Sequence, residues 1–142
     1  MDSVYRLAMQ EQIAELAEEL LEIRRLVDQQ GYMPTIVYRA AERNLQLLVE
    51  ACIGIAKQRL KGQGKQVPTE ARQVFSKLKA EGLDPTNVPW PQVVGMRNAL
   101  VHDYLNLDRE RIIEVITAGK YESLLYFAQS LLGSPLAEPP SL

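Results

Sequence analysis

Residues 94–108 read VGMRNALVHDYLNLD and contain His102, the only histidine of the chain. Apolar residues recur here at helical spacing, which predicts a mostly buried helix over Val93–Leu105. On that helix Arg97 lies in the middle of the apolar arc, where an unpaired guanidinium is costly. We therefore expect Arg97 either to pair with a buried carboxylate such as Glu42 or to bind a ligand.

Arg97 and His102 are five residues apart, which separates them by about 140° around an α-helix. Spacing alone therefore does not bring the two side chains together. The helix could end or tighten near His102, or a ligand could lie along a groove that both side chains reach. A symmetric dimer with this helix at its interface would instead bring two copies of the pair to one cleft. The sequence leaves all three arrangements open.

The pattern R-N-x-x-V-H-D-Y, which contains Arg97, Asn98, His102 and Tyr104, resembles the signature of the HepT-type HEPN proteins. The stretch YRAAERNLQLLVEACIGIA at residues 38–56 resembles the second helix of that family, and the order of segments is similar over most of residues 4–133. The resemblance implies an all-α fold. We expect an up-and-down bundle of about five to six helices with a long N-terminal helical hairpin.

Proteins of this family are small homodimeric ribonuclease toxins, encoded beside a minimal nucleotidyltransferase antitoxin called MntA. The resemblance implies that Arg97 and His102 form the active site. It also implies that Tyr104 is the residue to which the antitoxin attaches AMP, which silences the toxin. The expected partners are therefore a second copy of the chain, an MntA-like antitoxin and an RNA substrate, for which transfer RNA is one candidate.

Cleavage of RNA without a metal requires a base for the ribose 2′-proton, an acid for the leaving 5′-oxygen and a cation for the charge on phosphorus. Histidine suits the first two roles and arginine the third, because a guanidinium matches phosphate oxygens. Asn98 could orient the imidazole or donate to phosphate, and the Tyr104 hydroxyl could join the same cleft. Taken alone, each residue also has an ordinary structural role, His102 as a hydrogen-bonding group at a helix end and Tyr104 as a core residue.

Composition is consistent with one helical domain over residues 1–133, followed by a proline-bearing tail at 134–142 that we expect to be disordered. The chain has 142 residues, a net charge of −2, one cysteine and one histidine, so it has no internal disulfide and no metal cluster of the usual spacing. We expect no cofactor. The sequence contains no signal-peptide core and no apolar run of transmembrane length, so we expect a soluble, cytoplasmic protein without membrane contact.

The remaining pattern predicts where the helices lie. We expect long helices over residues 4–29 and 34–60, a third from a cap at Thr69 to Gly82, and an ordered loop over residues 84–91 before the motif helix. Asp108 is expected to cap a fifth helix that stops near Gly119, and a last helix is expected over residues 121–132. Residues 38–65 carry six basic side chains against two acidic ones, which could meet phosphates or simply be a solvated face.

The second predicted helix has two partly apolar faces, which suggests contact on both sides, one of them with another chain or helix. Arg39 and Glu42 lie three residues apart on it, so a local ion pair is the simple interpretation. The functional alternative is that one of them supports Arg97 and His102 from across the fold.

Two other functions fit the same residues. In the first, the protein is a non-catalytic helical interaction module that partners a nucleotidyltransferase, and Arg97 and His102 hold a nucleotide or brace a dimer. In the second, the protein is a toxin that its antitoxin inhibits by binding alone, and Tyr104 then carries no modification.

Overall fold

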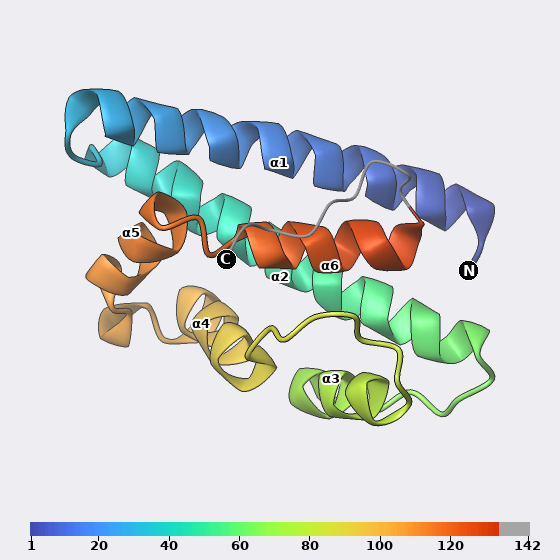
Figure 1. The fold of residues 1–142 in the computed structure, drawn as a ribbon. Helices are drawn as coiled ribbons and strands as arrows, with labels where there is room; N and C mark the ends of the chain where they lie inside the picture. Colours follow the sequence, from blue (N-terminus) through green and yellow to red (C-terminus); the bar gives the residue numbers. More distant parts are fainter. Residues whose placement is uncertain (134–142) are drawn as a thin grey trace.

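The computed structural model describes residues 1–133, and every regular element within that range is helical. The predicted all-α class is therefore confirmed, as is the long N-terminal hairpin (Figure 1). The tail at 134–142, expected to be disordered, lies outside the described residues. The helices are α1 (Ser3–Gln30), α2 (Thr35–Gly62), α3 (Ala71–Ala80), α4 (Trp90–His102), the short 3₁₀ helix η1 (Tyr104–Asn106), α5 (Arg109–Thr117) and α6 (Glu122–Leu132).

The hairpin of α1 and α2 follows directly from local sequence. The Asp2 carboxylate accepts hydrogen bonds from the backbone N–H groups of Val4 and Tyr5 at 2.7 and 3.2 Å, which caps the start of α1. Gly31 ends the helix in the left-handed conformation, with φ of 79°, which glycine adopts without steric cost. One face of α1 is an apolar stripe that is buried against the bundle, and it comprises Ile13, Leu16, Leu20, Ile23 and Val27.

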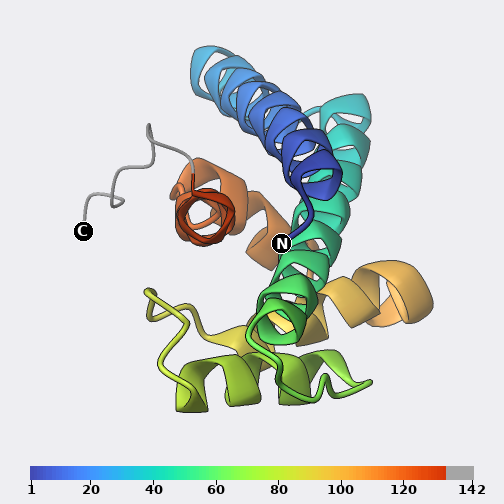
Figure 2. The ribbon, with the colours of Figure 1, turned by 90° about the vertical axis from the view of Figure 1, so that its right-hand side faces the viewer.

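Helix α2 is the centre of the fold, because it contacts α1, α3, α4, α5 and α6. Figures 1 and 2 show α1 and α6 along one side of α2 and helices α3 and α4 on the other. Both apolar faces of α2 are therefore covered within one subunit, and residues from each face, such as Leu45 and Val49, are fully buried. Of the two alternatives for the second contact, another chain or another helix, the structure shows helices of the same subunit.

The segment around α3 departs from the prediction at two points. Helix α3 begins at Ala71 after Glu70, and neither Thr69 nor Glu70 provides a side-chain cap. Trp90 was expected in the loop but is the first residue of α4. Its indole stacks on Phe75 at 3.7 Å between ring centroids and donates a hydrogen bond of 2.9 Å to Asp84. This stacking holds the start of α4 against α3.

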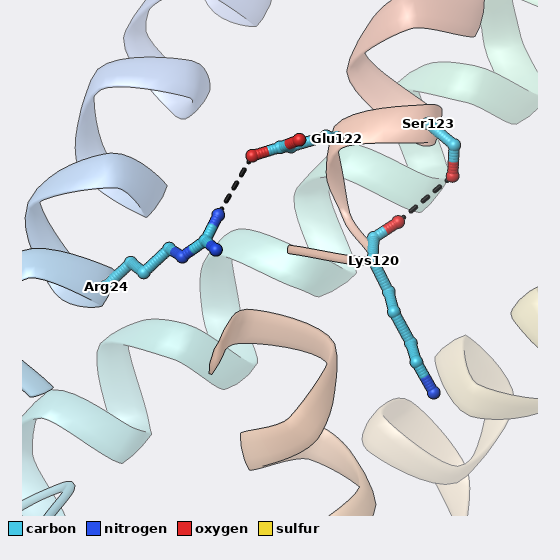
Figure 3. A network of polar contacts seen from close by, with 4 residues as sticks. All are labelled: Arg24, Lys120, Glu122 and Ser123. Carbon is cyan, nitrogen blue, oxygen red and sulfur yellow. Dashed lines mark hydrogen bonds and ion pairs between the residues drawn. The ribbon is translucent and has the colours of Figure 1, made fainter. Parts of the chain in front are cut away.

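The last two helices close the bundle as predicted. Asp108 caps α5 by accepting a hydrogen bond of 3.3 Å from the backbone N–H of Arg111, and Gly119 follows that helix with φ of 68°. Helix α6 packs against α1 and α2, and Figure 3 shows the Arg24 guanidinium of α1 pointing to Glu122 at the start of α6, at 2.9 Å. Within residues 1–133, no helix combines the length and the apolar character that crossing a membrane requires.

Candidate active site

The motif helix ends earlier than its pattern predicts, since α4 stops at His102 rather than at Leu105. Asp103 leaves the helical conformation with φ of −137°. Its side chain accepts a hydrogen bond of 2.8 Å from the Asn106 amide, and its carbonyl accepts one of 3.0 Å from the Asn106 backbone. Aspartate and asparagine side chains offer the backbone such local alternatives to a helix. Tyr104 consequently belongs to η1, and its place on a continued helix was predicted wrongly.

The motif helix is also less buried than predicted. Only Trp90 and Val94, in its first turns, are buried, because these turns are the ones that pack on the neighbouring helices. Arg97 and Asn98 are partly buried and His102 is exposed. Two apolar side chains close to His102 are exposed as well, Val101 at 40% and Leu105 at 97%. The polar side chains of the motif therefore lie at an open end of the subunit.

One interpretation of the sequence expected Arg97 to pair with Glu42, but the structure shows no such pair. Within residues 1–133 its guanidinium forms no ion pair, and its buried Nε atom has no hydrogen-bond partner. Together with Asn98, Arg72 and the acidic residue Glu70, Arg97 lines a cavity of about 300 Å³ between α4 and the start of α3. A partly buried, unpaired guanidinium beside a second arginine is an arrangement that suits an anionic group such as phosphate.

His102 lies at the last position of α4 with its side chain exposed. In the part of the chain that the structure describes, its ring forms no hydrogen bond, and none joins it to Arg97. The early end of α4 is one of the three arrangements considered above, but it does not by itself join the two side chains in one subunit. The imidazole is nevertheless accessible to a ligand from solvent.

Tyr104 reaches across to α2, where its hydroxyl donates a hydrogen bond of 3.3 Å to Glu42 Oε1. The same oxygen accepts a hydrogen bond of 2.9 Å from Arg39, so the predicted local ion pair is present. The Arg39 guanidinium also lies 5.3 Å above the Tyr104 ring. Arg39 and Glu42 thus contact the motif through Tyr104, and neither forms a hydrogen bond with Arg97 or His102 among residues 1–133.

Two further residues lie close to these side chains and were not identified from the sequence. Tyr38 is 2% exposed, and burial, followed by the nearby charge of Glu42, raises its pKa to about 12. The Arg109 guanidinium lies 4.1 Å above the Tyr38 ring. Arg109 adjoins the Asp108 cap of α5, which was the only signal that this position offered. We call Tyr38, Arg39, Glu42, Tyr104 and Arg109 the tyrosine–carboxylate cluster.

A second, larger cavity lies elsewhere. It measures about 670 Å³ and lies between α4 and α5, with a lining that includes Val93, Met96, Leu107, Ile112 and Val115. It contains neither Arg97 nor His102 nor Tyr104. Over residues 1–133, no three histidine, cysteine, aspartate or glutamate side chains are grouped so that they could hold a metal ion. The candidate site therefore consists of the exposed end of α4 with η1 and the adjoining part of α2.

Both the sequence and the fold of this chain are similar to those of known proteins. The chain is 35% identical over 75 residues to the mRNA nuclease HepT of Shewanella oneidensis. This alignment covers 51% of this chain and 56% of that protein. Its fold is similar to that of a chain in a crystal structure of a toxin–antitoxin with AMP-PNP, with a TM-score of 0.65 and 22% identity over 94% of this chain and 98% of the other. Residues 9–131 match the family described as ribonuclease HepT-like. The chain therefore belongs to the HepT-like ribonuclease family.

Proposed function

We propose that the protein is an endoribonuclease toxin that cleaves RNA without a metal ion, with Arg97 and His102 as its catalytic residues. The observation that carries the proposal is the unpaired Arg97 guanidinium beside a cavity, five residues before an exposed histidine. Family membership supports the activity, and the similar protein of Shewanella oneidensis is named as an mRNA nuclease. Messenger RNA is thus a candidate substrate beside transfer RNA.

In the proposed reaction the ribose 2′-oxygen attacks the neighbouring phosphorus and displaces the 5′-oxygen of the next nucleotide. His102 takes the 2′-proton as a base, and a protonated His102 gives a proton to the leaving oxygen. Arg97 stabilises the charge on the phosphate oxygens in the transition state. Asn98 lines the same cavity as Arg97 and holds the phosphate or the imidazole in place. The products are a 2′,3′-cyclic phosphate and a 5′-hydroxyl.

One imidazole cannot act as base and acid in the same step, so a homodimer that supplies a second His102 fits the reaction. The exposed apolar side chains Val101 and Leu105 flank His102 in sequence and offer a surface for a second copy. A two-fold axis near this end would bring two motif helices to one cleft. Because helices of the same subunit cover the two apolar faces of α2, the exposed end of α4 is the surface through which we expect the dimer to form.

The proposed regulator is an MntA-like minimal nucleotidyltransferase antitoxin that attaches AMP to Tyr104 in the cytoplasm. The Tyr104 side chain is 47% exposed, so its ring is accessible to a partner. Each AMP group would add about one negative charge and the bulk of a nucleotide two residues from His102. That charge would compete with RNA phosphate for the nearby arginines, which accounts for silencing.

The test is RNA cleavage by the purified protein in excess EDTA, before and after incubation with the partner nucleotidyltransferase and ATP. We expect EDTA-resistant cleavage that is lost as the intact mass rises by whole AMP units. Tyr104→Phe should gain no mass and remain active after the same incubation. Loss of cleavage in EDTA would refute the metal-independent mechanism. Silencing without a gain in mass would indicate inhibition by binding alone, and no cleavage under any condition would favour the non-catalytic interaction module.

A further inference from the structure

The hydroxyl of Tyr104 has a single hydrogen-bond partner within residues 1–133, the carboxylate of Glu42. The donor and acceptor oxygens are 3.3 Å apart, close to the reach of a general base before its substrate is bound. Glu42 is 8% exposed, and its second oxygen, Oε2, is buried without a partner. Burial of a carboxylate oxygen without a hydrogen-bond partner lowers stability, so such a group in a folded protein calls for a functional explanation.

We propose that Glu42 is the general base for nucleotide transfer to Tyr104. The proposal rests on the proposed function, in which Tyr104 accepts AMP. In the step, the Tyr104 oxygen forms a bond to the α-phosphorus of ATP while the bond to the bridging oxygen of pyrophosphate breaks. Pyrophosphate leaves with that electron pair, and the phenolic proton passes to Glu42 Oε1. One proton is released overall and nothing is oxidised or reduced.

Arg39 completes the arrangement from the same face of α2. Its guanidinium lies 2.9 Å from Glu42 Oε1, which compensates the charge of the buried carboxylate. It also lies 5.3 Å above the Tyr104 ring, and its side chain is 53% exposed. A triphosphate that approaches Tyr104 from solvent would therefore meet a cation beside the Tyr104 ring, which could stabilise negative charge on the phosphate oxygens.

The same cluster explains why Tyr104 rather than Tyr38 is the acceptor. Both phenols lie near Glu42, which is one cause of the raised pKa of Tyr38. Tyr38 is only 2% exposed and has Arg109 stacked on its ring, whereas Tyr104 is 47% exposed. A nucleotide can reach the second phenol without unfolding the bundle, so exposure selects the acceptor and Glu42 activates it.

The experiment compares Glu42→Gln with the wild type in the complete mixture of protein, partner nucleotidyltransferase, magnesium and ATP. The initial rate of AMP addition is followed by intact mass spectrometry. We expect the rate to fall by about 10²–10⁴-fold at neutral pH, the usual share of a general base. The matched control is Glu50→Gln, which makes the same change at an exposed position of α2, where Glu50 only accepts a hydrogen bond from Gln46.

A pH profile separates a base from a merely structural residue. The titratable groups that face Glu42 are Tyr38 and Arg39 of α2 and Tyr104 of η1, with Arg109 of α5 stacked on Tyr38. Tyrosine and arginine side chains ordinarily titrate at about pH 10 or above. Because Glu42→Gln lacks the base, its rate of AMP addition should therefore rise about tenfold per pH unit as the Tyr104 phenol ionises. The wild type should be nearly independent of pH between about 7 and 9.

The outcomes distinguish this inference from the function on which it rests. Wild-type modification on Tyr104 together with normal rates and pH profile for Glu42→Gln would overturn the role of Glu42 and leave AMP transfer standing. No adduct on the wild type would overturn both, while RNA cleavage would remain a separate measurement. If circular dichroism shows that Glu42→Gln is unfolded, Glu42→Asp takes its place in the experiment. This variant keeps the negative charge, but its shorter side chain moves the carboxylate away from the Tyr104 hydroxyl. A wild-type rate in Glu42→Asp would equally contradict the proposal, and a reduced rate with intact helicity would support it.

Discussion

Helix α2 and the C-terminal half of α4 both carry apolar side chains on more than one face, but only α2 is covered by its own subunit. Leu45, Leu48 and Ile55 of α2 are completely buried, whereas Val101 and Leu105 near the end of α4 and in η1 are exposed. An apolar face that the subunit covers holds the fold together. Exposed apolar groups beside unpaired polar ones mark a surface where a partner or substrate binds.

Removal of the unpaired guanidinium should have a large effect on activity. We expect Arg97→Ala to lower the rate of RNA cleavage by about 10²–10³-fold, the usual cost of losing one group that stabilises a transition state. The free energy of unfolding should change little, because Arg97 forms no ion pair within residues 1–133. Arg25→Ala, at an exposed position of α1, is the matched control and should cleave at the wild-type rate. Equal rates in both variants would show that Arg97 is not catalytic.

The opposite behaviour is expected at the centre of the fold. Leu48→Ala removes a side chain with no exposed surface and should lower the free energy of unfolding by about 2–5 kcal/mol. Urea denaturation followed by circular dichroism measures this loss. The fraction that remains folded should cleave RNA normally, because Leu48 has no place in the site. A loss below about 1 kcal/mol would contradict the central position of α2.

The exposed end of α4 should matter for assembly rather than for folding. Leu105→Asp should weaken the homodimer by about tenfold or more, because burial of one leucine is worth about 1.5–3 kcal/mol and tenfold corresponds to about 1.4 kcal/mol. Sedimentation at several protein concentrations measures the dissociation constant. Leu7→Asp, on an exposed part of α1, serves as the control. A wild type that is monomeric at micromolar concentration would refute the dimer itself.

The smallest effect is expected at the ion pair between α1 and α6 in Figure 3. Arg24 and Glu122 are 2.9 Å apart, but their side chains remain 31% and 43% exposed. Such pairs are worth about 0.2–1 kcal/mol because water and salt screen them. Arg24→Ala should therefore lower the melting temperature by no more than a few degrees. A larger loss would mean that the start of α6 depends on this contact more than on its apolar packing.

The same comparison explains which features could be predicted from the sequence. The apolar stripe of α1 and its end at Gly31 follow from local sequence, and the structure confirms the predicted cap at Asp108. The end of α4 was misjudged because hydrogen bonds between Asp103 and Asn106 compete with an otherwise helical apolar pattern. The spacing of apolar residues up to Leu105 carries no information about that competition.

The tyrosine–carboxylate cluster was only half visible in the sequence. Arg39 and Glu42 form the local pair that their spacing predicts. The hydrogen bond from Tyr104 to Glu42 joins residues 62 positions apart, and only the packing of α4 against α2 brings them together. Arg109 gave no signal of its contact with Tyr38, because stacking on a ring in another helix leaves no periodic pattern. Contacts of this kind depend on tertiary structure.

The most direct test of the central claim, that the exposed end of α4 is a ribonuclease site, is the rate of RNA cleavage by His102→Ala in excess EDTA. His102 is exposed and forms no hydrogen bond within residues 1–133, so the variant should unfold at the same urea concentration as the wild type. We predict that its cleavage rate falls by about 10²–10⁴-fold. Cleavage by His102→Ala at the wild-type rate would contradict the account.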